Sequence, residues 1–374
     1  MSIKARVIAI YLPQFHPIAE NDEWWGKGFT EWTNVGKAKP LFKGHYQPRV
    51  PADLGYYDLR LPEVRSAQAE LAKYAGIEGF MYWHYWFGEG RRLIERPFTE
   101  VVESGSPDFP FCLGWANESW ENKLWNANDT KHNKLLIEQK YLGEEDNKKH
   151  FFHLLSAFQD KRYIRVNNRP FFLIYKPEKF KDVGLFIKQW NNLAKQNGLA
   201  DGFYFVAHIG NFADYHKFIE AGFNAVEVYP LGRIPAYLKK TRSFFSKAIY
   251  KIDQYGKSFT KRKKLNIVPY EKAIEILLNK EEDSQENVIP TIMPNWDHSP
   301  RSGNNAWILH NSTPDLFKKH VNDALDCVKN KPDENKIILL KSWNEWAEGN
   351  YMEPDIVFGK QYIEALKKTL EFGD

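Results

Sequence analysis

Eight short apolar segments constrain the fold of this 374-residue chain most strongly. Each is four to eight residues long and is bounded by polar or turn-forming residues, as buried strands usually are. The segments are Arg6–Tyr11, Gly79–Trp83, Phe111–Trp115, Phe171–Tyr175, Phe203–Ala207, Ala225–Tyr229, Ile289–Met293 and Ile337–Ser342. Strands that alternate with helices indicate a parallel sheet with crossover helices, and eight is the number that closes a barrel.

Helical periodicity occupies most of the intervening stretches. Apolar residues recur three and four positions apart in Pro62–Tyr74, Val183–Gln196, Phe212–Ala221, Tyr270–Leu278, Asp315–Lys329 and Lys360–Glu371. We therefore predict an α/β protein, a (β/α)8 TIM-type barrel, with residues 1–374 forming one domain that carries long βα loops. A doubly wound open sheet is the alternative. It usually has a glycine-rich phosphate turn after its first strand, where this chain has Leu12-Pro13-Gln14-Phe15-His16-Pro17.

The composition argues against several classes of protein. No apolar run approaches the ~20 residues of a membrane helix, and the first residues lack the pattern of a signal peptide, so we expect a cytoplasmic protein with no membrane span. A net charge of +4 is too small to indicate nucleic-acid binding. The two cysteines, Cys112 and Cys327, lie in unrelated segments and indicate neither a disulfide framework nor a cysteine-ligated metal.

Aromatic and polar residues gather where the predicted strands end. In a barrel of this type the functional groups lie at the carboxyl ends of the strands. The 13 Trp, 19 Tyr and 26 Phe exceed the ordinary needs of a core, and aromatic faces can stack on pyranose rings. We therefore expect an oligosaccharide or polysaccharide as the binding partner. The candidate substrate-binding residues are Tyr11, His16, Trp83, His84, Trp115, Asn117, Glu118, Tyr175, His208, Trp296, Asp297, Asn344 and Trp346.

Two glutamates follow the last predicted strand and are the candidate catalytic residues. Glu345 and Glu348 lie in Trp343-Asn344-Glu345-Trp346-Ala347-Glu348-Gly349. Cleavage of a glycosidic bond needs one group to protonate the leaving oxygen and a second, ionised group to assist at the anomeric carbon. Two carboxylates that share a partly apolar pocket cannot both ionise freely, so one can serve as an acid near neutrality. An isolated Glu-x-x-Glu would more often be a cap and a solvated side chain, but this position favours catalysis.

A different pairing of carboxylates is also compatible with the sequence. Ordinary retaining glycosidases place their two carboxylates ~5 Å apart on different strands. Glu345 and Glu348 can both face a sugar only if the chain turns after Glu345, which Gly349 permits. The alternative pairs Glu118 with Glu345. Glu353 and Asp355 are expected to support the site from behind or to be solvated.

Several motifs resemble the WbsX-type polysaccharide-biosynthesis proteins of the glycoside hydrolase family 99-like group. They are Tyr11 to Pro17, Trp24-Trp25-Gly26 with Gly28 to Trp32, Trp115 to Trp120, and Trp343 to Asn350. The resemblance covers nearly the whole chain. It implies a barrel related to endo-α-mannosidases that acts, with retention and without a metal or other cofactor, on α-linked mannose or a similar sugar inside a longer glycan. It also implies that Glu345 deprotonates the sugar 2-hydroxyl to form a 1,2-anhydro intermediate, while Glu348 serves as the acid and then as the base.

The sequence lacks features that several other functions would need. A glycosyltransferase that uses a nucleotide sugar would usually show a doubly wound fold or an Asp-x-Asp metal site, and the sequence has neither. A metal-dependent barrel hydrolase would want a His-x-His pair at the first strand, but His16 has no such neighbour. A non-catalytic glycan-binding protein would not need clustered carboxylates. Transglycosylation remains open.

A basic excursion interrupts the barrel pattern at residues 231–264. It ends in Lys261-Arg262-Lys263-Lys264, and Asp253 is its one acidic residue. Such a stretch is either a solvated loop or a surface that meets an anionic partner. The candidate partners are an anionic glycan, a lipid-linked carrier and a nucleotide phosphate.

Overall fold

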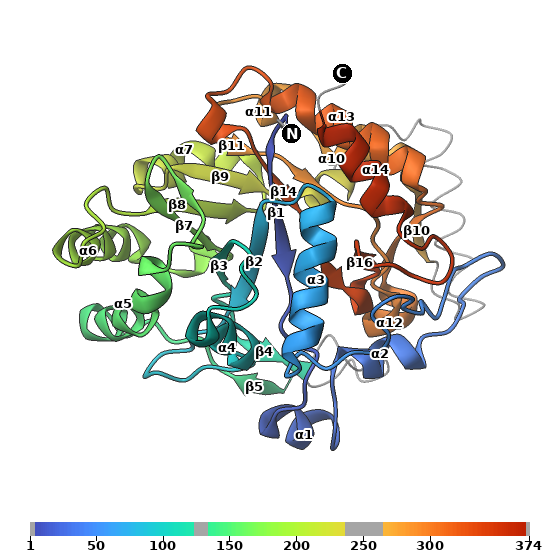
Figure 1. Ribbon diagram of the computed structural model, residues 1–374, viewed down its shortest axis with the longest axis horizontal. Coiled ribbons are helices and arrows are strands. Elements are labelled where there is room, and N and C mark those ends of the chain that lie inside the picture. The colour runs from blue at the N-terminus through green and yellow to red at the C-terminus, as the bar shows by residue number, and fades with distance from the viewer. Residues whose placement is uncertain (1–3, 123–133, 236–264, 372–374) are drawn as a thin grey trace, which may run out of the picture.

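Parallel strands form a (β/α)8 TIM-type barrel, as the sequence predicts. The computed structural model describes residues 4–122, 134–235 and 265–371. Neighbouring strands pair in the order β11-β9-β8-β7-β3-β2-β1-β14-β12 (Figure 1). The strands are β1 (Arg6–Tyr11), β2 (Gly79–His84), β3 (Phe111–Trp115), β7 (Arg169–Ile174), β8 (Tyr204–Ile209), β9 (Ala225–Val228), β11 (Val288–Ile289), β12 (Thr291–Ile292) and β14 (Ile337–Leu340).

Pro290 divides the seventh strand of the barrel into β11 and β12. β11 pairs with β9 on one side, whereas β12 pairs with β14 on the other. Proline has no N–H to donate, so the ladder is interrupted at this residue. Its carbonyl oxygen still accepts a 3.0 Å hydrogen bond from the N–H of Leu339. The two halves therefore act as one strand, and the barrel closes with eight strand positions.

The first and last strands lie beside each other in the middle of the sheet. β1 and β14 pair in parallel, with Arg6 opposite Ile337 and Ala9 opposite Leu340. All four residues of β14 are buried, and so are five of the six in β1. Strands covered on both faces read as near-continuous apolar runs, which explains why the sequence locates them well.

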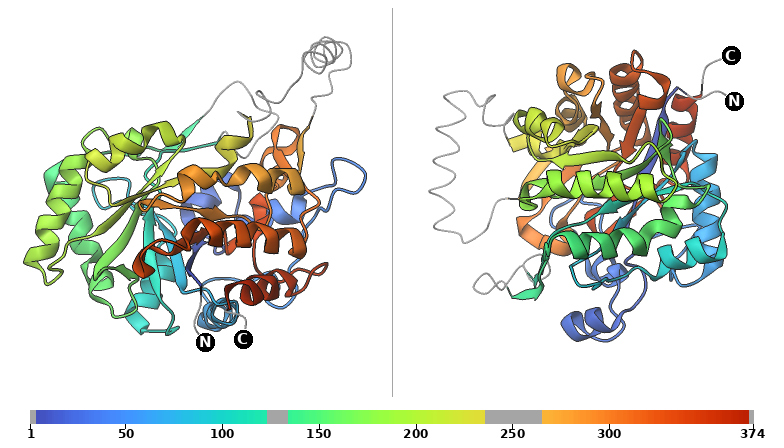
Figure 2. Two further views of the ribbon diagram at one scale, coloured as in Figure 1. Left: turned by 90° about the horizontal axis from the view of Figure 1, so that it is seen from above. Right: turned by 90° about the vertical axis from the view of Figure 1, so that its left-hand side faces the viewer.

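Helices cover the outside of the sheet, as Figures 1 and 2 show. The predicted bounds of α3 and α6 are confirmed, whereas the predicted helix at 212–221 begins with a 3-10 turn, η3 (Phe212–Asp214). Thr313 caps α13 by accepting a hydrogen bond from the Leu316 N–H. The outer helices are α3 (Pro62–Tyr74), α4 (Arg96–Ser104), α5 (Glu144–Gln159), α6 (Val183–Gln196), α7 (Tyr215–Glu220), α10 (Tyr270–Leu277), α13 (Pro314–Val328) and α14 (Gln361–Leu370).

Short elements in the βα loops build the end of the barrel at which the strands finish. They escape prediction because segments of two to seven residues carry too little periodicity. After β1 come α1 (Ala19–Trp25) and α2 (Glu31–Lys37), and after β12 comes α12 (Ser299–Ser302). Three small sheets join β4 (Trp120–Glu121) to β5 (Leu135–Ile137), β10 (Asn266–Pro269) to β13 (Trp307–His310), and β15 (Asn344–Glu345) to β16 (Asn350–Tyr351). The remaining elements are β6 (Arg165–Val166), α11 (Lys280–Asp283), η2 (Pro177–Lys179), η4 (Pro230–Gly232), η5 (Gly303–Asn305), η6 (Asp333–Asn335) and η7 (Trp346–Glu348).

Most of the basic excursion lies outside the described residues. The structure describes its first five residues, 231–235, whereas 236–264, with the run Lys261 to Lys264, are not described. The role of this segment therefore stays a prediction. Within the described ranges, none of the helices combines the length and the apolar character that a bilayer crossing requires.

Candidate active site

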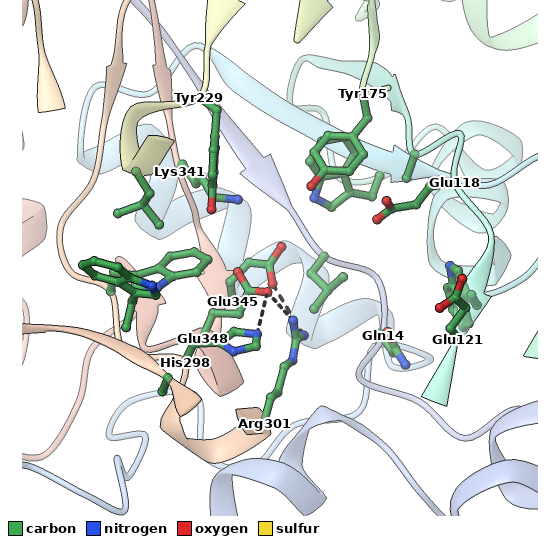
Figure 3. A pocket seen from close by; sticks show the side chains of 18 of the residues that line it. Gln14, Glu118, Glu121, Tyr175, Tyr229, His298, Arg301, Lys341, Glu345 and Glu348 are labelled. Atoms are coloured by element: carbon green, nitrogen blue, oxygen red, sulfur yellow. Dashed lines mark hydrogen bonds and ion pairs between the residues drawn. The ribbon is translucent and has the colours of Figure 1, made fainter. Parts of the chain in front are cut away.

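A cavity of about 670 Å³ opens at the carboxyl ends of the barrel strands (Figure 3). Its lining includes Trp83 at the end of β2, Tyr175 after β7, Tyr229 after β9, and Lys341 after β14. The size and the mixed aromatic and polar lining are typical of a small-molecule or sugar site. Further aromatic walls come from Trp25, Tyr85, Trp120, Trp296 and Trp307.

Glu345 and Glu348 both line this cavity because the chain coils between them. Glu345 ends β15, and the single 3-10 turn η7 follows it and ends at Glu348. In a 3-10 helix, side chains three residues apart lie one above the other. Gly349 then reverses the chain with φ +57°, and a Cβ atom at this position would lie 2.7 Å from the Cβ of Asp297. Both the backbone conformation and the close packing therefore require glycine here.

Arg301, from α12, binds this pair and a third carboxylate. Its Nη1 contacts Oε1 of Glu348, and its Nη2 lies 2.9 Å from Oε1 of Glu31 and 3.7 Å from Oε2 of Glu345. Glu31 is the first residue of α2 and is fully buried. A single guanidinium thus joins the loops after the first, seventh and eighth strands.

The two glutamates of the pair have opposite proton affinities. Burial, followed by the negative charge of Glu348, raises the pKa of Glu345 to about 7. Burial opposes ionisation of Glu348 too, but the positive charges of Arg301 and then Lys341 outweigh it and lower the pKa of Glu348. Below about pH 7 the pair therefore holds one proton, as an acid and a base working together require.

Other polar groups surround the pair. Nε2 of His298 lies 3.8 Å from Oε1 of Glu348, and burial lowers the pKa of His298 to about 4, so this imidazole is neutral at neutral pH. The ammonium group of Lys341 lies 5.5 Å from the centre of the Trp296 ring. The cavity thus places cationic, carboxylate and aromatic side chains side by side, a combination suited to sugar hydroxyls and pyranose faces.

A buried network supports the turn from behind. Glu353 is 3% exposed and accepts hydrogen bonds from Trp346 Nε1 at 2.6 Å, Gln68 Nε2 at 2.6 Å and the Tyr57 hydroxyl at 2.8 Å. Burial raises the pKa of Glu353 to about 7. Because Trp346 lies between the two cavity glutamates in sequence, this network fixes the turn that carries them.

Four predicted substrate contacts line the cavity with the pair: Trp83, Glu118, Tyr175 and Trp296. Glu118 lies on the opposite side of the cavity from Glu345 and Glu348, near Tyr175 (Figure 3). His208 is not part of the lining. It stacks on Tyr175 with ring centres 4.8 Å apart, and its Nδ1 contacts the Glu227 carboxylate.

The other eight predicted contacts are buried and lie outside the lining of this cavity, so their contact with substrate stays a prediction. Several of these side chains hydrogen-bond to other groups in the interior. The Tyr11 hydroxyl donates to Gln68, His84 pairs with His150, and the Asn344 amide bonds to the backbone of Leu12. The eight are Tyr11, His16, His84, Trp115, Asn117, Asp297, Asn344 and Trp346. Near a strand end, successive side chains point to different sides, and the sequence does not say which side faces the cavity.

Three important groups were absent from the predicted set: Arg301, Lys341 and Glu31. Lys341 directly follows β14, so its position in the sequence could have identified it as a candidate cavity residue. Glu31 lies in the Gly28 to Trp32 motif, but nothing in the motif shows that its side chain is buried beside a cation. Arg301 has no distinguishing signal, because a single arginine between Ser, Pro and Gly is ordinary in a loop.

Known proteins with the same fold include glycoside hydrolases. A solved structure titled glycoside hydrolase-like protein matches with a TM-score of 0.57 and 16% identity, over 99% of this chain and 94% of that one. A GH99 endo-α-mannosidase from Bacteroides thetaiotaomicron matches with a TM-score of 0.54 and 14% identity, over 97% and 95% of the two chains. At these identities the likeness concerns the fold. The chain thus shares the barrel fold of these proteins.

The sequence places the chain more narrowly. It belongs to the family described as Glycosyltransferase WbsX, whose model matches residues 7–366. An uncharacterized protein named WxcX from Xanthomonas campestris pv. campestris strain B100 is 32% identical over 375 aligned residues, which are 99% of this chain and 50% of the relative. A homologue from a second strain of that pathovar matches to the same extent. The chain therefore spans about half the length of these curated relatives.

Proposed function

We propose that this protein is a retaining glycoside hydrolase that cleaves an α-linked, mannose-like residue of a bacterial surface glycan or of an intermediate in its synthesis. The observation that carries the proposal is the Glu345 and Glu348 pair, with opposite pKa shifts, at the edge of a cavity walled by aromatic rings. The pair offers one proton and one base within reach of the same sugar, which is what hydrolysis of a glycoside requires. The endo-α-mannosidase fold supports the choice of sugar.

The reaction would proceed in two balanced steps. In the first, one carboxylate takes the proton of the sugar 2-hydroxyl and the 2-oxygen bonds to C1. The C1 bond to the leaving oxygen breaks with its electron pair, and that oxygen takes the proton of the other carboxyl group. In the second, water attacks C1 and gives a proton to that second group. The bond from C1 to the 2-oxygen breaks, and the 2-oxygen regains its proton from the first. The net reaction consumes one water.

The charge of the cavity supports hydrolysis over transfer from a nucleotide sugar. The described lining includes four carboxyl side chains, Glu118, Glu121, Glu345 and Glu348, and two cationic ones, Arg301 and Lys341. A diphosphate would meet more negative than positive groups in this lining. The excess of carboxylates suits a neutral sugar unit better. Glu118, together with Tyr175, would then bind a sugar farther from the cleaved bond.

Transfer to a sugar acceptor is the second candidate, and the glycosyltransferase description of the family favours it. The anhydro intermediate could be opened by the hydroxyl of another sugar in place of water. The same residues would act, because the acceptor needs the same base. The basic segment 231–264 would then recruit an anionic glycan or a lipid-linked carrier, a role suggested by its sequence charge alone.

A defined panel of α-mannosides tests the proposal. The wild-type protein should release products with retained configuration and without a nucleotide sugar, as read by mass spectrometry and by NMR of the anomeric protons. The variant with both Glu345→Gln and Glu348→Gln is the control for contaminating activity. Transfer products that grow with added acceptor would favour the second candidate. Turnover that appears only with a nucleotide sugar would contradict the proposed hydrolase.

A further inference from the structure

Lys341 differs from Arg301 in how its charge is used. Arg301 contacts Glu348 and lies 2.9 Å from Glu31, so its guanidinium is paired. Lys341 directly follows β14, lines the cavity and is half-buried. Its ammonium group lies 5.5 Å from the centre of the Trp296 ring and forms no ion pair or hydrogen bond with the residues that the structure describes. Of the two cations in the described lining, Lys341 is therefore the one whose charge remains for a ligand.

The charges of the cavity are unevenly distributed. Figure 3 shows Lys341 and Tyr229 on one side of the glutamate pair, and Glu118 with Glu121 on the other. The hydroxyl of Tyr229 makes no hydrogen bond within the described part of the chain, so it can donate one to a ligand beside Lys341. An anionic group would be attracted to this side of the cavity and repelled from the side that carries Glu118 and Glu121. The cavity therefore favours one orientation of a glycan with a negative charge at one end.

We propose that Lys341 is a specificity-determining residue that binds a carboxylate of the substrate, so that the glycan contains an acidic sugar of the uronic acid class. This inference rests on the proposed glycosidase function and narrows its substrate class. The unit whose C1 bond breaks at the pair is neutral. The carboxylate belongs to a unit next to it, on the Lys341 side of the cavity.

A single negative charge fits this place better than a phosphate does. A half-buried ammonium group has lost part of its water, and a carboxylate can replace it with a charge-assisted hydrogen bond. Glu348 lies close by, since the charge of Arg301 and then that of Lys341 lower its pKa against the effect of burial. A phosphate monoester, with about two negative charges, would be repelled by this carboxylate, whereas one ammonium can compensate one carboxylate. The face of Trp296 can pack against the ring of the same sugar.

Matched trisaccharides test the proposal. In two series of α-mannotriosides, either the first or the third unit carries a carboxylate at C6, its methyl ester or a phosphate monoester, while the middle unit stays neutral. The ester resembles the acid in shape but has no charge. We expect the wild-type protein to prefer the acid over the ester by roughly tenfold or more in kcat/KM in one of the two series, because a hydrogen bond to a charged group contributes that much. The phosphate should be a poorer substrate than the acid.

Variants of Lys341 assign the preference to this side chain. Lys341→Met removes the charge, keeps a side chain of similar length over Trp296, and should abolish the preference for the acid. Any effect of Lys341 on Glu348 cancels in the ratio of acid to ester, because both compounds use the same pair. Lys341→Arg should keep most of the preference. Lys176→Met is the matched control and should keep the wild-type ratio, because the Lys176 ammonium lies 4.5 Å from the centre of the Tyr175 ring but is not part of the cavity lining.

Binding measurements separate this inference from the function on which it rests. Calorimetry with sulfur-linked analogues, which resist cleavage, compares the acid with the ester whether or not turnover occurs. If the acid binds more tightly through Lys341 but no compound is cleaved, the proposed function fails and the carboxylate site stands. If the compounds are cleaved but the wild-type protein prefers the ester or the phosphate, or does not discriminate in either series, the inference is overturned and the hydrolase stands. A preference that survives in Lys341→Met also overturns it. The comparison on the wild-type protein decides the matter even if that variant does not fold.

Discussion

The backbone N–H of Asp297 donates a 2.6 Å hydrogen bond to the carbonyl oxygen of Glu348. This bond ties the loop after the seventh strand to the turn after the eighth. Residues of the loop after β1 hold Asp297 in turn, since its carboxylate lies 2.7 Å from both His45 Nε2 and Gln47 Nε2. Burial opposes ionisation of Asp297, but the hydrogen bond from His45 and the charge of Arg49 lower its pKa to about 2. Three loops thus hold the Glu348 backbone in place.

The Glu345 and Glu348 pair gives the first prediction. Glu345→Gln and Glu348→Gln should each lower the turnover of a natural glycan by ~10²- to 10⁴-fold, because each removes a proton donor or acceptor while keeping the size of the side chain. Glycan affinity and melting temperature check that binding and fold survive. Glu118→Gln is the matched control, and it should change KM more than kcat. If Glu118→Gln and Glu345→Gln abolished turnover while Glu348→Gln kept it, the pairing of Glu118 with Glu345 would be favoured.

The turn at Gly349 gives the second prediction. Gly349→Ala should lower the free energy of unfolding, because the new Cβ would lie 2.7 Å from that of Asp297 and the residue has φ +57°. Gly359→Ala is the control, since Gly359 has φ +51° with nothing within 4 Å of its added Cβ. We expect roughly 1–2 kcal/mol from the backbone strain in both and a further ~1–3 kcal/mol at Gly349. Urea unfolding measures the difference, and equal losses would show that the contact with Asp297 is unimportant.

The buried carboxyl group of Glu353 gives the third prediction. Its pKa of about 7 in the folded protein exceeds the ordinary 4.5, so its contribution to stability is complete below pH 4.5 and is lost as pH rises through 7. Glu353→Gln does not titrate. The wild-type protein should therefore lose roughly 3 kcal/mol relative to this variant between pH 4.5 and pH 8. Urea unfolding at several pH values measures this, and histidine titrations cancel in the difference. A constant difference would mean that Glu353 is ionised in the fold.

The fourth prediction is that activity does not depend on a metal ion. The pair supplies both proton donor and base, so the proposed reaction needs no Lewis acid. In the described ranges, no group of three His, Cys, Asp or Glu side chains is arranged to hold a metal ion. Treatment with a chelator should leave the rate of glycan cleavage unchanged. Loss of activity that a divalent cation restores would instead favour a metal-dependent transferase or hydrolase.

The barrel could be predicted because its strands are recognisable in the sequence. β1, β3, α3 and α6 have the predicted bounds, since buried strands are apolar throughout and these helices keep a long amphipathic pattern. The split at Pro290 was not foreseen, although a proline inside an apolar run is a recognisable sign of a broken ladder. The short helices α2 and α12, which carry Glu31 and Arg301, were missed because four to seven residues contain too few turns to show a period.

The site was harder to predict than the fold. A motif shows that Glu345 and Glu348 occur together, but only the 3-10 turn and the placement of Arg301 distinguish their charges. Conversely, Asn344 and His84 occur at strand ends like the cavity residues do, yet their side chains bond within the interior. Side-chain direction at a strand end depends on how the loops pack, which no local pattern of residues contains.

The pairing of β1 with β14 also affects how the chain is made. During synthesis, β1 leaves the ribosome more than 300 residues before its partner at Ile337–Leu340. Until then one edge of the nascent sheet exposes unpaired backbone groups, and such edges invite association with other chains. The cavity, the Glu345 and Glu348 pair and the closed sheet are completed together, only after β14 has been made. The pairing of β14 with β1 should therefore govern how far folding depends on chaperones in the cell. Partly synthesised chains that lack β14 should carry no activity.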